Sequence, residues 1–251
     1  MELFDAHNHL QLENPEEHLH NYEQKRIVAA LNATCEKEWV ELESFAQNYP
    51  AQIVVGYGIH PWNAGAVLPD WEKRLGTILE THPAAFVGEI GLDGYRANRA
   101  CGPGLSRQWE ILMPQLRLAS RMKRPVSLHS VRAWSELRQA LRDVHLSDFL
   151  VHRFKGDSAM VGEIVEMGGF LSVHSDTLCH VRSIDALRTI PPDRLLIETD
   201  YNGSRSGVGA PQEELVLLLQ GLSANLGRSL DDVARLTREN ACRFYHLRPI
   251  L

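Results

Sequence analysis

Cysteine is scarce in this sequence, and the few cysteines lie far apart. The chain has 4 cysteines in 251 residues, and no two of them stand in a CxxC spacing. A disulfide framework or a structural zinc knuckle needs closely and regularly spaced cysteines, so neither is expected to organise the fold. We expect four buried thiols, which are Cys35, Cys101, Cys179 and Cys242.

Long hydrophobic runs are also missing. No apolar stretch approaches the roughly 18 residues that a membrane-spanning helix needs. The first residues enter a polar, histidine-containing segment without the basic and apolar regions that mark a signal peptide. We therefore expect a cytoplasmic protein with no membrane partner.

The chain has no block rich in lysine and arginine. Its formal net charge is −6 at pH 7, and a long nucleic-acid footprint normally needs clustered positive charge. The sequence therefore predicts no extended duplex-binding surface, although metal ions in a pocket could still engage a single phosphate. The oligomeric state is left open by the sequence.

Short apolar segments alternate with helical patterns along the whole chain. Helical periodicity between most of these segments indicates parallel strands covered by helices, and hence one (β/α)8 TIM barrel spanning residues 1–251. The polar stretch at 11–24 is expected to be a loop, and Pro114 is expected to kink or break a long helix. The expected strands are 3–9, 26–31, 53–58, 85–90, 125–129, 149–152, 169–173 and 194–200.

Histidines and carboxylates recur where the expected strands end. His7 and His9 are two residues apart, so in a strand their side chains share one face and could bind one ion. Two histidines seldom complete a catalytic site, so further ligands are expected at the other strand ends. Because the active site of such barrels lies at the carboxyl ends of the strands, the pattern predicts a divalent-metal centre there. The other ends carry His60, Glu89, His129, His152, His174 and Asp200.

Six short motifs occur in a characteristic order along the chain. They are FDAHNHL at 4–10, GIHP at 58–61, GEIGLD at 88–93, PVSLHS at 125–130, ETD at 198–200 and ENACRF at 239–244. In this order they resemble the motifs of the TatD family of metal-dependent hydrolases, within the amidohydrolase superfamily. The resemblance implies a hydrolase of ester bonds, a deoxyribonuclease acting on DNA ends or a small phosphoester, with two divalent ions per subunit (zinc, manganese or magnesium).

The resemblance also implies a role for each residue that matches a family motif. One ion would be held by His7, His9 and Asp200, the other by His129 and His152, and Glu89 would bridge the two. A carboxylate suits that last role because its two oxygens can span ions about 3.5–4 Å apart.

Catalysis is expected to depend on Asp200 and Glu89. A metal-bound hydroxide would attack phosphorus, with Asp200 as proton acceptor or orienting base and Glu89 holding the metal centre together. Three residues just past strand ends, namely His60, Arg132 and Arg153, are expected to bind the substrate phosphate.

The sequence departs from the family pattern at several places near the expected rim. Trp62 stands where a second histidine is common, and Gln11 stands where an acidic residue is common. Arg153 replaces a small residue, and the run 201–203 replaces one that contains proline. These changes bear on substrate preference, which rim loops set, and they leave the expected ligands in place.

Two other functions fit parts of the pattern. A related amidohydrolase could use the same ions on a C–N or carboxylic ester bond, since two metals serve both chemistries. Strand four lacks the terminal lysine that is often carbamylated in such enzymes, which favours the phosphoesterase. A non-catalytic barrel that only binds a partner is the second alternative, and the complete set of expected ligands argues against it.

Overall fold

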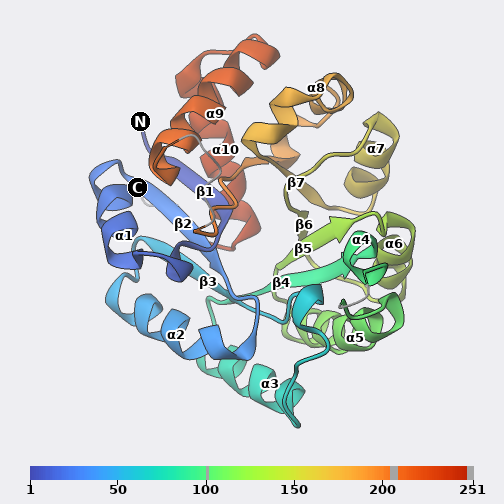
Figure 1. Cartoon of the computed structure of the whole chain (residues 1–251). Helices are drawn as coiled ribbons and strands as arrows, with labels where there is room; N and C mark the ends of the chain where they lie inside the picture. Colours follow the sequence, from blue (N-terminus) through green and yellow to red (C-terminus); the bar gives the residue numbers. More distant parts are fainter. Residues whose placement is uncertain (100–101, 204–208, 248–251) are drawn as a thin grey trace. The chain divides into compact units, whose positions relative to one another are not determined.

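The chain has the (β/α)8 barrel fold that the sequence predicts. The computed structural model describes residues 1–99, 102–203 and 209–247 (Figure 1). Its eight strands form one sheet in the order β1 to β8, and the β1–β2, β3–β4, β4–β5 and β7–β8 pairs are parallel. By its internal contacts the chain divides into two compact units, which are described in turn.

The first unit combines the N-terminal residues 1–31, a short segment at 49–54 and residues 151–251. Its helices and strands are β1 (Leu3–Asn8), α1 (Pro15–Gln24), most of β2 (Ile27–Asn32), α7 (Ser158–Glu166), β7 (Phe170–Val173), α8 (Val181–Leu187), β8 (Leu195–Ile197), α9 (Pro211–Leu226) and α10 (Leu230–Phe244). The blue β1 lies beside the red α10 in Figure 1, although they come from opposite ends of the sequence.

Residues just after α10 fix the position of β1. Tyr245 stacks on Phe4 with 5.4 Å between ring centroids, and its hydroxyl donates a 2.6 Å hydrogen bond to the carbonyl of Ala6. Backbone bonds then join the ends of β1 and β8, from Asp200 N to His7 O at 2.9 Å and from His9 N to Tyr201 O at 2.7 Å. The first and last strands therefore bring their terminal side chains together.

The second unit contains residues 32–48 and 55–150. Its helices and strands are α2 (Trp39–Asn48), most of β3 (Ile53–Tyr57), α3 (Trp71–Thr81), β4 (Phe86–Asp93), α4 (Gly94–Ala97), α5 (Leu105–Met122), β5 (Val126–Val131), α6 (Trp134–Asp143) and most of β6 (Phe149–Val151).

Two buried glutamines of α5 hold the carboxyl ends of β3 and β4. The side-chain oxygen of Gln115 accepts from Ile59 N at 2.7 Å, and that of Gln108 accepts from Asp93 N at 2.7 Å. These bonds satisfy backbone groups that the sheet ladder leaves free, so the residues around them keep a defined direction.

Some local expectations were wrong. The polar stretch at 11–24 contains α1, because Pro15 stands at the start of the helix, where its missing N–H costs nothing, and Leu19 and Tyr22 pack inward. The break expected at Pro114 is absent, because α5 continues through it from Leu105 to Met122, whereas a kink there stays a prediction.

The thiols are less buried than expected. Cys179 is exposed, Cys35 and Cys242 are partly buried, and all three are free; Cys101 lies outside the described residues. Among the described residues no helix is both long and apolar enough to cross a membrane.

Candidate metal centre

The first unit brings two histidines and a carboxylate together where β1 and β8 end. His7 and His9 lie with their Nε2 atoms 3.3 Å apart. Asp200 Oδ1 lies 3.8 Å from His7 Nε2 and 3.6 Å from His9 Nε2. All three side chains are at most 9% exposed. The sequence predicted these residues as one set of ligands, and the structure places them side by side.

His152, which follows β6, joins the same unit through His7. The two rings stack with centroids 3.8 Å apart and planes 12° apart. His152 Nδ1 lies 3.3 Å from Glu198 Oε1, and Glu198 is fully buried with Ser172 donating to its other oxygen. One ligand atom from each of His7, His152 and Glu198 lies within 4.8 Å of the others.

Glu198 is not among the site residues predicted from the sequence. Its position two residues before Asp200 could have indicated a site residue, because residues i and i+2 of an extended segment point to the same side. The structure makes it a second carboxylate of this cluster, oriented by Ser172 and next to an imidazole.

A buried network below the cluster connects β1 to the end of β8. Asp5 accepts hydrogen bonds from Thr199 N at 2.9 Å, Thr199 Oγ1 at 2.6 Å and the Tyr22 hydroxyl at 2.8 Å. Complete burial raises the pKa of Asp5 to about 7, although these hydrogen bonds act to lower it and the charge of Glu198 adds to the rise. The network fixes the backbone between two metal-competent carboxylates.

Within the second unit, His60, Glu89 and His129 lie together. Glu89 Oε1 lies 2.8 Å from His129 Nδ1 and 3.2 Å from His60 Nε2. The two imidazoles are 3.2 Å apart at His60 Nε2 and His129 Nδ1. The three residues offer ligand atoms within 4.8 Å of one another. His60 is therefore close enough to Glu89 to bind the same metal ion.

Asp93 and Trp62 support His129 from its other side. Asp93 Oδ2 lies 3.3 Å from His129 Nε2 and accepts a 2.6 Å hydrogen bond from Trp62 Nε1. Burial alone would raise the pKa of Asp93, but hydrogen bonds from His129, Trp62 and the backbone of Arg96 lower it to about 2. Asp93 is therefore ionised at neutral pH and orients the ring, as carboxylates do for metal-binding histidines.

The donor atoms of both clusters suit divalent metal ions. Imidazole nitrogens and carboxylate oxygens are the ligands that zinc and manganese take in catalytic sites. Burying several such groups together is costly unless a cation or hydrogen bonds compensate them, so the composition of each cluster fits a bound ion.

Comparison with known proteins identifies the family. The family described as TatD related DNase matches residues 4–246, nearly the whole chain. This chain belongs to the TatD family.

Several relatives cover most of this TatD family protein. Human Deoxyribonuclease TATDN3 is 23% identical over 97% of this chain and 94% of its own length. Escherichia coli YjjV, named an uncharacterized metal-dependent hydrolase, is 31% identical over 75% of this chain and 74% of its own length. The crystal structure of E. coli YjjV superimposes with a TM-score of 0.87 at 25% identity, and that of a TatD family hydrolase from Entamoeba histolytica with 0.84 at 17%; each covers 98% of both chains. The chain is thus a TatD family metal-dependent hydrolase.

Arg153, one of the departures from the TatD pattern, lies between two carboxylates. Its NH1 donates to Asp200 Oδ2 at 2.6 Å, and its Nε and NH2 donate to Asp176 Oδ2 at 3.2 and 2.9 Å. Burial would raise the pKa of Asp200, but a hydrogen bond from His9 and the nearby His152 and His7 hold it well below its usual range. The guanidinium expected to bind substrate is therefore engaged by the protein itself.

Two other predicted residues have partners outside these clusters. His174 ends β7 and pairs with Asp176 at 2.9 Å; burial lowers its pKa, but this pairing raises it above the usual value. Arg132 lies against the Tyr95 ring in the second unit, 5.2 Å from its centroid.

The pairing of His129 with His152 on one ion, and the bridge by Glu89, stay predictions.

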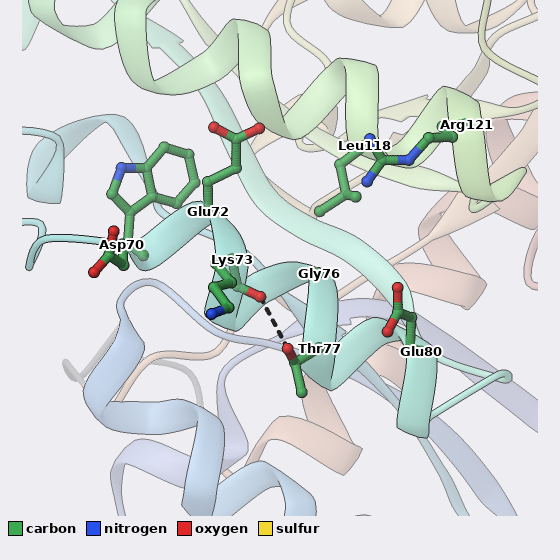
Figure 2. Close-up of a pocket in the computed structure, with 9 residues that line it drawn as sticks. Asp70, Glu72, Lys73, Gly76, Thr77, Glu80, Leu118 and Arg121 are labelled. Carbon is green, nitrogen blue, oxygen red and sulfur yellow. Dashed lines mark hydrogen bonds between the residues drawn. The ribbon is translucent and has the colours of Figure 1, made fainter.

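A hollow on the outside of the second unit is not part of this centre. It runs along α3 toward α5, and Figure 2 shows Lys73, Gly76, Thr77 and Glu80 following one side of α3, with Leu118 and Arg121 on α5. None of the predicted site residues lines it.

Proposed function

We propose that this chain is a metal-dependent phosphodiesterase that acts on DNA ends. The observation that carries the proposal is the pair of buried histidine–carboxylate clusters, one in each unit, within a chain of the TatD family. The name of the human relative, a deoxyribonuclease, supports the choice of DNA.

The residues that would hold metal are the predicted ones, with one addition. They are His7, His9, His152 and Asp200 in the first unit, Glu89 and His129 in the second, and Glu198 as the addition. Two bound divalent ions would supply Lewis-acid activation and neutralise charge that develops on the phosphate.

The side chains around these positions have separate tasks. Asp200 stays ionised and presents Oδ1 toward the histidine pair, so this atom can take a proton from the attacking water. Its Oδ2 is held by Arg153, which fixes the direction of the carboxylate. His60 contacts both Glu89 and His129 and would donate a hydrogen bond to a phosphate oxygen.

A panel of small substrates tests this proposal. Metal-free protein is supplied with zinc, manganese or magnesium and assayed on bis(p-nitrophenyl) phosphate, p-nitrophenyl acetate and a p-nitroanilide. We expect the phosphodiester to show the largest rate increase over its own uncatalysed hydrolysis, because the site pairs carboxylates with cations that neutralise an anionic substrate.

The same panel separates the alternatives. A larger rate increase over the uncatalysed reaction for the acetate or the anilide would overturn the proposal in favour of an amidohydrolase acting on a carboxylic ester or C–N bond. No turnover with any ion, together with no bound metal, would point to a non-catalytic binding protein.

A further inference from the structure

Two exposed aromatic rings and three arginines lie together beside the cluster of the second unit. Trp62 follows β3 and is 52% exposed, and Tyr95 follows β4 and is 45% exposed. The guanidinium carbon of Arg96 lies 5.4 Å from the centroid of the Trp62 ring. Those of Arg99 and Arg132 lie 4.6 and 5.2 Å from the centroid of the Tyr95 ring. These five residues are called the arginine–aromatic rim.

The arginines of this rim differ from Arg153 and Arg74 in having no ion-pair partner among the described residues. Within the described part of the chain, no ion pair joins Arg96, Arg99 or Arg132 to a carboxylate, whereas Arg153 and Arg74 both pair with acids. Arg96 and Arg99 lie in the stretch 94–99, which contains no aspartate or glutamate, although the whole chain carries a net charge of −6. The arginine–aromatic rim is therefore a locally positive surface on an acidic protein.

Trp62 is held in place although half of it is exposed. Its backbone N–H donates to His60 Nδ1 at 3.1 Å, and its indole N–H donates to Asp93 at 2.6 Å. The ring meets that of His60 edge-on, with centroids 5.1 Å apart and planes 89° apart. Because this exposed ring is already fixed, a ligand that stacks on it costs little side-chain conformational entropy.

We propose that the arginine–aromatic rim binds single-stranded nucleic acid next to the bond that is cleaved. A base would stack on Trp62, and the backbone phosphates would pair with Arg96, Arg99 and Arg132. An exposed ring next to guanidinium groups fits unpaired bases, which have free faces, better than a duplex or an acidic peptide. This proposal rests on the proposed function for the position of the cleaved bond, and binding itself can be measured without catalysis.

The test measures binding without turnover. A short fluorescein-labelled oligothymidylate is titrated in EDTA and followed by fluorescence anisotropy over a range of salt concentrations. The triple variant R96Q/R99Q/R132Q should bind at least about 10-fold more weakly. The slope of log affinity against log salt should fall by about 2, since each lost phosphate contact removes about 0.7.

A matched triple variant controls for the change in net charge. R117Q/R121Q/R142Q also removes three exposed arginines, from the C-terminal halves of α5 and α6, which lie toward the opposite ends of the strands. It should bind as the unchanged protein does. Equal weakening in both triple variants, or none in the first, would overturn the proposal.

Substitution of Trp62 tests stacking. Trp62→Leu should weaken binding by roughly 5- to 100-fold, and Trp62→Phe should retain most of the affinity, because it keeps an aromatic face and loses only the N–H. Equal losses in the two variants would show that the bond to Asp93, not stacking, matters, and would overturn the role of Trp62. Competition by poly-glutamate as strong as that by unlabelled oligothymidylate would overturn nucleic acid as the occupant.

The proposal and the proposed function can fail separately. With metal added, R96Q/R99Q/R132Q should lose activity on the oligonucleotide through a higher KM, and the unchanged protein is assayed on both the oligonucleotide and bis(p-nitrophenyl) phosphate. If the unchanged protein binds the oligonucleotide but cleaves neither substrate, only the proposed function fails. If it cleaves both but R96Q/R99Q/R132Q retains its oligonucleotide affinity, only the rim proposal fails.

Discussion

Asp200 uses its two oxygens for different partners. Oδ1 faces His7 and His9, and Oδ2 accepts a 2.6 Å hydrogen bond from Arg153, which Asp176 holds from the other side. A partner that orients a ligand carboxylate in this way normally strengthens metal binding. Arg153 therefore fits a positioning role for Asp200 better than the substrate-binding role that its place after β6 suggested.

Removal of the guanidinium should separate these two roles. We expect Arg153→Ala to weaken metal binding by about 10-fold or more and to lower kcat, because the Asp200 carboxylate loses its fixed direction. Arg153→Lys should recover part of the affinity, since it keeps the charge without the planar fork. Competition with a chromogenic chelator gives the metal affinity, and a small diester gives kcat and KM. A higher KM with unchanged metal affinity would instead make Arg153 a phosphate-binding residue.

The sequence predicted residue types at strand ends better than it predicted their partners. His7, His9 and Asp200 come together because the alternation of strands and helices brings the first and last strands side by side. The contact between Arg153 and Asp200 joins residues that are 47 positions apart, and no local pattern encodes it. The pairing of Trp62 with Asp93 was not predicted for the same reason, since the two residues are 31 positions apart.

At the scale of single elements, the pairing of β4 with β5 sets the position of His129. Gly91 is the register partner of His129 and has a φ of +147°, which residues with side chains rarely adopt. A Cβ on Gly91 would lie 2.0 Å from the carbonyl oxygen of His129. The glycine therefore allows the close approach of the two strands beneath Glu89 and His129.

Substitution of Gly91 should disturb both the strand pair and the cluster. We expect Gly91→Ala to lower the free energy of unfolding by more than about 2 kcal/mol, because the backbone atoms that it meets cannot move aside cheaply. Gly162→Ala in α7 is the matched control, since a Cβ there meets no atom within 4 Å, and it should stabilise by about 0.5–1 kcal/mol. Urea unfolding of both variants checks this; equal stabilities would contradict the account.

The positions of most elements could be predicted from periodicity, and the exceptions have local causes. The segment of α1 looked like a loop because polar residues dominate it, and its apolar residues Leu19 and Tyr22 are too few to mark a periodic pattern. Pro114 did not break α5, whose inward side buries residues such as Ile111 and Leu118 along its length. Packing outweighed the lost hydrogen bond there.

At the scale of the whole molecule, the barrel fold explains why a dispersed set of residues forms a site. Parallel strands place all their carboxyl ends on one face, so ligands can be taken from distant parts of the chain. Within the first unit the structure brings together His7, His9, His152 and Asp200, and within the second His60, Glu89 and His129. The alternation of elements was sufficient to predict the fold, whereas the membership of each cluster needed the coordinates.

The central claim is that both clusters bind metal and that hydrolysis depends on it. The most direct measurement is the metal content per chain, by mass spectrometry of metal-reconstituted protein, alongside turnover of bis(p-nitrophenyl) phosphate. We expect metal-free protein to be inactive, and His152→Ala and His129→Ala each to lose bound metal and at least about 100-fold in turnover. His145→Ala, at an exposed histidine, should change neither. Full turnover by the metal-free protein, or by either cluster variant, would contradict the account.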